Sequence, residues 1–195
     1  MKYCLVGSSS NLLNQNLGYK IDKFDVVIRF NRAPVKGFES HVGKTTTYRF
    51  INRVVCNGGK ESGEKDTIID SRYDNQHFIV DEENPHFKKS NFDKMFPSSL
   101  SCTTISRPLE LKNLYAKFDF LPHFTRTNPT VGFTMICYCL NRDLDFTICG
   151  YGIDQHPSIS PHYWEQKNYK STHDYNCERQ IIKLLIEKKL IKVLT

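Results

Sequence analysis

Two histidines in the last quarter of the chain have side chains that could take part in acid–base chemistry. His162 begins the run His-Tyr-Trp-Glu, and His173 precedes a segment with the apolar spacing of a helix. Imidazole has an unperturbed pKa of about 6.5, so it can accept a proton near neutral pH. A histidine before a helix is also a common cap or solvated residue, and the aromatic run could simply pack on a core. The two residues alone leave these choices open.

A loop of small and polar residues follows the first apolar run of the chain. Residues 3–6 have the pattern of a buried strand, and Gly-Ser-Ser-Ser-Asn follows at residues 7–11. Small residues let the backbone approach a phosphate or a ribose, and Ser and Asn add hydrogen-bond donors. This arrangement is typical of the first unit of a nucleotide-binding α/β fold.

Apolar periodicity and turn residues predict the elements that must position these groups. Further strands are predicted at residues 25–30, 48–51, 67–69, 77–80 and 145–150, and helices at residues 108–118, 131–140 and 174–190. Strands that alternate with helices indicate an α/β fold with a mostly parallel sheet flanked by helices. We expect residues 1–195 to form a single Rossmann-like domain.

Ligands of such sheets bind at the carboxyl ends of the strands. The loops at residues 7–11, 31–34 and 150–152 all follow predicted strands, and Pro129 and Thr130 stand just before a predicted helix. We therefore expect the three loops to line one crevice, with this helix start facing it. The free N–H groups of a helix start favour an anion.

Composition restricts the classes of function. The chain has 195 residues, of which 39% are apolar and 12% aromatic, enough for a buried core. Its net charge of +6 is spread along the sequence, and no nucleic-acid-binding motif is present, so we expect no nucleic-acid partner. The sequence has neither a signal peptide nor an 18-residue apolar run, so we expect a chain that is neither secreted nor membrane-spanning.

The seven cysteines are predicted to be reduced thiols that act as small hydrophobic side chains. Cys137 and Cys139 stand too close for a C-x-x-C metal knuckle, and the other histidines lack metal-ligand spacing. Reduced thiols fit a reducing compartment, so a cytoplasmic location is expected.

Four segments, in order and spacing, resemble the sequence motifs of the animal-type sialyltransferases. The large motif is similar to Cys4–Leu12, Ile21-Asp22, Asp25–Pro34, Gly37-Phe38 and Val42–Thr46; the small motif to Asn128–Gly132 through Ile148–Gly152; the third motif to His162–Glu165; and the very small motif to His173 with Glu178. The resemblance covers about half of the chain, and residues 53–125 match no motif.

This resemblance implies a GT-A-like sialyltransferase variant of the fold and an inverting glycosyltransferase. Its donor would be CMP-sialic acid and its acceptor a hydroxyl of a galactose-type sugar. Inversion requires a base that takes the acceptor proton during one in-line displacement. The family's base position falls on His173, and its third-motif histidine, which stabilises the phosphate of the leaving CMP, falls on His162.

The resemblance also assigns donor-binding positions. They fall on Ser8, Ser9, Asn11, Asn31, Thr130, Val131, Gly132, Gly150 and Tyr151. Asn31 could instead serve only as a turn former. Glu178 is expected to orient structure near its helix start. Asp143-Leu-Asp145 imitates the metal-binding D-x-D of other glycosyltransferases, but the resemblance implies an enzyme that needs neither metal nor cofactor.

Three departures from the family pattern affect these expectations. The family's disulfide joins the large and small motifs, and here Cys4 holds its first position whereas the second falls near Asp143, so no bridge is expected. Val131 stands where the family usually has a hydroxyl, so a hydrogen bond to the donor is lost or the donor sugar differs. The family's membrane anchor and stem are absent from the sequence, which fits a minimal bacterial or viral form.

Two alternatives stay open. Kdo or another ulosonic acid also travels as a CMP ester, and Val131 fits a change of donor. A non-catalytic module that binds CMP or a glycan is the other, although His162 and His173 argue against it. Acceptor choice is expected to lie in residues 53–125, whose Phe and Lys residues suggest peripheral membrane contact with a glycolipid acceptor.

Overall fold

The computed structural model describes residues 1–52, 55, 77–81, 102–124, 129–154, 162–165 and 173–195. In this part of the chain, seven strands form one sheet in the order β5-β4-β3-β2-β1-β6-β7, and every neighbouring pair is parallel. The strands are β1 (Tyr3–Val6), β2 (Val26–Phe30), β3 (Tyr48–Ile51), β4 (His77–Asp81), β5 (Cys102–Ile105), β6 (Phe146–Cys149) and β7 (Lys192–Val193). The predicted parallel sheet is confirmed.

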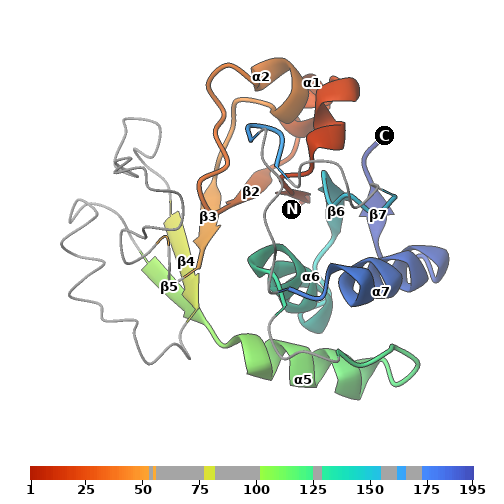
Figure 1. Cartoon of the computed structure of the whole chain (residues 1–195). Helices are drawn as coiled ribbons and strands as arrows, with labels where there is room; N and C mark the ends of the chain where they lie inside the picture. Colours follow the sequence, from red (N-terminus) through yellow and green to blue (C-terminus); the bar gives the residue numbers. More distant parts are fainter. Residues whose placement is uncertain (53–54, 56–76, 82–101, 125–128, 155–161, 166–172) are drawn as a thin grey trace.

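Helices cover both faces of this sheet (Figure 1). One face carries α5 (Arg107–Lys117), α6 (Val131–Asn141) and α7 (Tyr175–Glu187), and the other carries the short helices η1 (Ser10–Asn14), α1 (Gly18–Ile21) and α2 (Glu39–Val42). Successive strand residues point to opposite faces. Leu5 and Ile28 therefore pack in the core against the long helices, whereas Cys4 and Val27 pack against the short ones.

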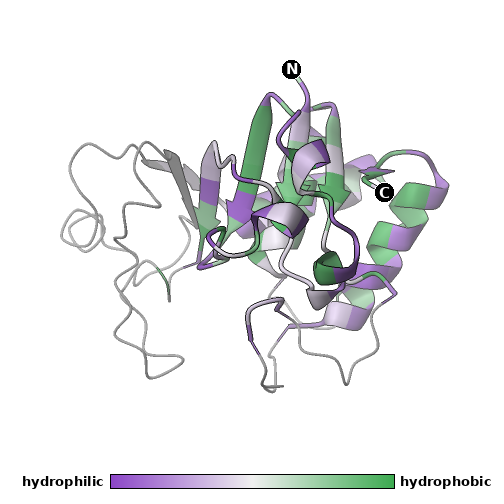
Figure 2. Ribbon diagram, turned by 90° about the horizontal axis from the view of Figure 1, so that it is seen from above, coloured by the Kyte–Doolittle hydropathy of each residue, from purple (hydrophilic) through white to green (hydrophobic). Residues whose placement is uncertain are grey.

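The long helices differ in how they bury apolar surface. Most residues of α6 are buried, because the helix lies between the sheet and α5. In contrast, α7 is amphipathic and buries Ile181, Ile182 and Leu185 against the sheet. Figure 2 shows the strands as a largely hydrophobic layer and both hydrophobic and hydrophilic residues on α7. None of the helices in the described part of the chain is long and apolar enough to cross a lipid bilayer.

The strand order reverses between β1 and β6. After β1 the chain adds β2 to β5 on one side, and α5 and α6 then return it to β6 on the other side of β1. Ligands of α/β sheets bind beyond the carboxyl ends of the strands at such a reversal. The loops after β2, β1 and β6 are neighbours at this edge, as predicted.

Most predicted elements are confirmed to within about three residues. The strand predicted at residues 67–69 lies outside the described residues. The sequence did not predict η1, α1, α2, β5 or β7, because each of these short elements contains at most two apolar residues, whereas each predicted strand that is confirmed contains three or more.

A buried arginine organises the loop between α2 and β3. The guanidinium of Arg29 donates to the carbonyl oxygens of Val42 at 2.7 Å and Thr45 at 2.8 Å, and to the hydroxyl of Thr46 at 2.9 Å. Arg29 has no exposed surface, and desolvation lowers the pKa of its guanidinium. Several backbone acceptors therefore depend on this one side chain.

We expect Arg29→Met to lower the free energy of unfolding by at least about 3 kcal/mol, because buried carbonyls would lose their donors. Urea unfolding followed by circular dichroism measures the change. Lys44→Met, an exposed cation in the same loop, is the control and should change stability by less than about 0.5 kcal/mol. Equal stability of the two variants would show that the Arg29 bonds do not hold this loop.

Candidate functional site

The loops after β1 and β6 are in direct backbone contact at the carboxyl edge of the sheet. The N–H of Gly7 donates to the Cys149 carbonyl at 2.8 Å, and the N–H of Ser9 donates to the Gly150 carbonyl at 2.9 Å. A Cβ atom at Gly7 would lie 2.2 Å from the Gly150 oxygen, and Gly150 itself has φ +69°. Only glycine permits this approach, so both residues are needed to bring the loops together.

The polar side chains of the loop after β1, residues 7–11, make different contacts. The hydroxyl of Ser9 accepts from the Asn11 N–H at 3.3 Å and caps η1, and Ser9 is only 4% exposed. The carboxamide oxygen of Asn11 is buried and has no hydrogen-bond partner among the described residues. An unpaired buried acceptor is costly, so Asn11 is the side chain of this loop best suited to receive a donor group of a ligand. Ser8 is half-buried, and its carbonyl accepts from the Tyr163 N–H at 2.9 Å.

Asn31 forms the turn at the end of β2. Its φ of 46° lies in the left-handed region, which asparagine tolerates better than most residues. Its side-chain oxygen accepts from the Asn52 N–H at 2.9 Å, and its carbonyl accepts from the Arg49 guanidinium at 2.8 Å. Asn31 thus forms a turn, and its donor-binding role stays a prediction.

The start of α6 lies against the loop after β6. Thr130 caps the helix by accepting from the Phe133 N–H at 3.1 Å, and the Tyr151 hydroxyl donates to the Gly132 carbonyl at 3.2 Å. A Cβ atom at Gly132 would lie 3.3 Å from the Tyr151 ring. Val131 is 6% exposed and belongs to the main core, so it can reach a ligand only through its backbone N–H.

Glu178 joins the start of α7 to the start of α6. Its carboxylate accepts from the Thr130 N–H at 2.6 Å and from the Thr130 hydroxyl at 2.9 Å. Glu178 is 6% exposed, and burial raises the pKa of its carboxyl to about 7, although the two bonds from Thr130 act in the opposite direction. The geometry agrees with the prediction that Glu178 orients structure at a helix start.

His162 lies in an aromatic segment that packs beside the first loop. Its Nδ1 is 2.6 Å from the Glu165 carboxylate, and its ring stacks on Trp164 with centroids 4.6 Å apart. Tyr163 is buried, contacts Phe38 and donates its hydroxyl to the Pro34 carbonyl. Tyr163 therefore fits the packing interpretation, while the carboxylate beside Nδ1 fixes the orientation of the half-buried imidazole of His162.

His173 stands directly before the residue that caps α7. The cap is Asp174, whose carboxylate accepts from the Cys177 N–H at 3.2 Å, so the capping interpretation of His173 is wrong. His173 is half-buried, and its ring centroid is 5.9 Å from that of Tyr175. Glu178 follows His173 by five residues and belongs to the first turn of α7. The bonds between Glu178 and Thr130 therefore link the helix that follows His173 to the start of α6.

The Asp143-Leu-Asp145 sequence lies at the opposite edge of the sheet, because Asp145 directly precedes β6. Asp143 pairs with Lys117 at 2.5 Å and Asp145 with Lys192 at 2.5 Å. In the part of the chain that the structure describes, no three His, Cys, Asp or Glu side chains gather as metal ligands. These aspartates serve ion pairs far from the loops of the predicted site.

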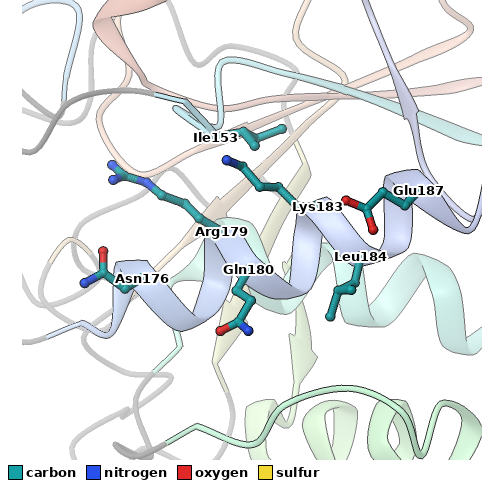
Figure 3. Close-up of a pocket in the computed structure, with 7 residues that line it drawn as sticks. All are labelled: Ile153, Asn176, Arg179, Gln180, Lys183, Leu184 and Glu187. Atoms are coloured by element: carbon teal, nitrogen blue, oxygen red, sulfur yellow. The ribbon is translucent and has the colours of Figure 1, made fainter.

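A shallow cavity of about 360 Å³ lies along α7 rather than at the donor loops. Figure 3 shows Lys183 of α7 pointing toward Ile153, which follows the loop after β6, and Arg179 extending toward the N-terminal end of α7. Lys183 pairs with Asp154 at 2.8 Å, and Glu187 also lines the cavity. Its charges are therefore balanced, and it contains none of the predicted site residues.

Comparison with known proteins gives the family. The model of glycosyltransferase family 29 (sialyltransferase) matches residues 1–190. The chain belongs to this family. A CMP-N-acetylneuraminate-beta-1,4-galactoside alpha-2,3-sialyltransferase of Rattus norvegicus is 27% identical over 207 residues, which cover 96% of this chain and 55% of the rat protein. The chain thus spans about half the length of that relative.

Two further relatives show local and structural similarity to this family 29 chain. A type 2 lactosamine alpha-2,3-sialyltransferase of Rattus norvegicus is 53% identical over 51 residues, or 26% of this chain and 15% of that protein. The crystal structure of a mammalian sialyltransferase matches with a TM-score of 0.67 at 19% identity, covering 99% of this chain and 68% of that one. The predicted sialyltransferase fold is confirmed.

The raised pKa of Glu178 gives this family 29 chain a pH-dependent stability. The ordinary pKa of 4.5 rises to about 7 on folding, so the stability due to the protonated carboxyl is present below about pH 4.5 and is lost as the pH rises through about 7. One pKa unit corresponds to about 1.4 kcal/mol, so the full change is about 3 kcal/mol.

We expect Glu178→Gln to remove this dependence, because the amide stays neutral. The free energy of unfolding of the variant minus that of the wild type should increase by up to about 3 kcal/mol between pH 5 and pH 8. Urea unfolding at several pH values measures this difference. Glu187→Gln changes an exposed carboxylate of the same helix and is the control. Parallel curves for Glu178→Gln and the wild type would show that the Glu178 carboxyl does not titrate in this range.

Proposed function

We propose that this chain is an inverting, metal-independent transferase that moves sialic acid from CMP-sialic acid to a hydroxyl of a galactose-type acceptor. Membership of family 29 supports the reaction class, and the name of the rat relative supports this donor and acceptor. The observation that carries the proposal is the link between the α6 start and α7 through Thr130 and Glu178. This link ties the helix that follows His173 to a helix start suited to a phosphate.

The donor would bind at the edge where β1, β2 and β6 end. Helix starts have N–H groups without intrahelical partners, so the backbone of Val131 and Gly132 would face the phosphate. Asn11 would offer its unpaired carboxamide oxygen to a donor group of the nucleoside. The imidazole of His162 would donate a proton to a phosphate oxygen as CMP leaves, with Glu165 holding the ring in place through Nδ1.

His173 would act as the general base. Its ring would take the acceptor's hydroxyl proton as the acceptor oxygen attacks the anomeric carbon of the sugar. The bond from that carbon to the CMP phosphate oxygen breaks in the same step, with its electron pair leaving on the phosphate. A single in-line displacement of this kind inverts the anomeric centre.

Calorimetric titration with CMP, CDP, UDP and GDP, first without metal and then with EDTA, tests the donor class. We expect CMP to bind at least about tenfold more tightly than the other nucleotides, and EDTA to leave its Kd unchanged. Binding that prefers a diphosphate nucleotide, or that needs a metal, would contradict the proposal.

The His173→Ala variant tests the catalytic base. We expect kcat with CMP-sialic acid and a galactoside to fall by about 10²- to 10⁴-fold, while the Kd for CMP changes by less than about twofold. His123→Ala is the control, because His123 is exposed and stacks on Tyr115 at 4.1 Å. Full activity of His173→Ala would refute this assignment.

A donor panel separates the two alternatives from this proposal. Transfer from CMP-Kdo but not from CMP-sialic acid would keep the reaction and change the sugar. Selective CMP binding without transfer or donor hydrolysis would instead support a non-catalytic binding module.

A further inference from the structure

Arg107 contacts the segment that leads into α6, although no sequence motif includes it. Arg107 is the first residue of α5, and Ser106 caps this helix by accepting from the Leu109 N–H at 3.3 Å. The Nη1 of Arg107 donates to the Pro129 carbonyl at 3.0 Å. Pro129 is buried and directly precedes Thr130, so Arg107 connects α5 to the start of α6.

Thr130 is held by bonds at each of its polar groups. Its N–H and hydroxyl both donate to Glu178, and its carbonyl accepts from the Thr134 hydroxyl at 2.9 Å. The peptide unit before Thr130 contributes the Pro129 carbonyl, which Arg107 binds. The path of the backbone into α6 therefore depends on Arg107 on one side and Glu178 on the other.

Arg107 also acts electrostatically on Glu178. Among the described residues, the titratable groups that face the Glu178 carboxylate are Asp174, which caps α7, Cys177 of α7, Cys137 of α6, Tyr151 after β6, and Arg107 of α5. Among these groups, Arg107 carries the positive charge. It lowers the pKa of Glu178, whereas Asp174 raises it.

We propose that Arg107 is a positioning residue of the donor site, which binds the Pro129 carbonyl and faces Glu178 with a positive charge to hold the start of α6 in place for the donor phosphate. This inference rests on the proposed function for the identity of the donor. Without Arg107 the Pro129 carbonyl loses its donor, and the buried carboxylate loses its cation. An uncompensated negative charge at the start of α6 would also repel the phosphate.

The variants Arg107→Gln and Arg107→Lys separate the charge from the hydrogen bond, and Lys112→Met, an exposed cation on α5, is the control. We expect Arg107→Gln to raise the Kd for CMP and the KM for the donor about tenfold at pH 8 and to leave the acceptor KM unchanged. Arg107→Lys should raise the Kd for CMP and the KM for the donor about threefold, and Lys112→Met should match the wild type in both constants.

The carbon-13 resonance of the Glu178 carboxyl gives a readout that needs no ligand. Glu178→Gln identifies the resonance by its absence. We expect its titration to move to higher pH in Arg107→Gln and to return close to the wild-type position in Arg107→Lys. A role limited to general stability would not shift this titration.

The outcomes separate failure of this inference from failure of the proposed function. Wild-type CMP affinity and an unchanged Glu178 titration in Arg107→Gln would overturn the inference alone. No CMP binding by the wild type, together with a shifted titration in Arg107→Gln, would overturn the proposed donor and the donor-site role of Arg107, and leave only its contact with Glu178.

A double variant covers the case in which Arg107→Gln does not fold. The combination with Glu178→Gln removes the uncompensated carboxylate, so we expect the double variant to fold. We compare the Kd for CMP of the double variant with that of Glu178→Gln. The increase should be smaller than the roughly tenfold increase expected when Arg107→Gln is made in the wild type. A double variant that also fails to fold would show that Arg107 supports folding in general and would overturn the proposal.

Discussion

The buried carboxylate of Glu178 is the interaction on which the arrangement of the site depends. Thr130 presents two donors, its N–H and its hydroxyl, and Glu178 has one oxygen for each. Burial of a carboxylate is costly, and hydrogen bonds from both donors offset part of that cost. Because Glu178 belongs to the first turn of α7 and Thr130 caps α6, the pair fixes the start of one helix against the other.

The second constraint is the close approach of backbone to backbone at the point where the strand order reverses. Gly7 and Gly150 let the loops after β1 and β6 touch, and Gly132 lets the Tyr151 ring lie against the start of α6. Surfaces built from the main chain present N–H groups whose positions are set by the sheet and the helix. The specific chemistry then depends on few side chains, chiefly Asn11, His162 and His173.

The sequence predicted the sheet and the edge at which the site lies, because short apolar strands followed by small polar loops are local patterns. It did not predict what several side chains do, since their partners are distant in sequence. The Asn31 oxygen binds the Asn52 N–H, and Val131 packs into the core. Arg107 stands in a region without a motif, and only the tertiary structure brings it to Pro129. By contrast, His173 and Glu178 share one short motif, so the sequence alone could associate them.

The thiols show how the sheet can join the large and small motifs without the disulfide of the family pattern. Cys4 is a free, fully buried cysteine on β1, and the position expected for its partner falls near Asp143, which pairs with Lys117 at the opposite edge of the sheet. A hydrogen bond with Cys4 and burial both raise the pKa of Cys149 well above its ordinary value, so its thiol stays protonated and unreactive. Because β1 pairs with β2 on one side and β6 on the other, the sheet itself already joins the two segments that a disulfide would connect. A covalent link would therefore add little to the geometry of the site in the folded chain, and its main effect would be to restrict the unfolded state.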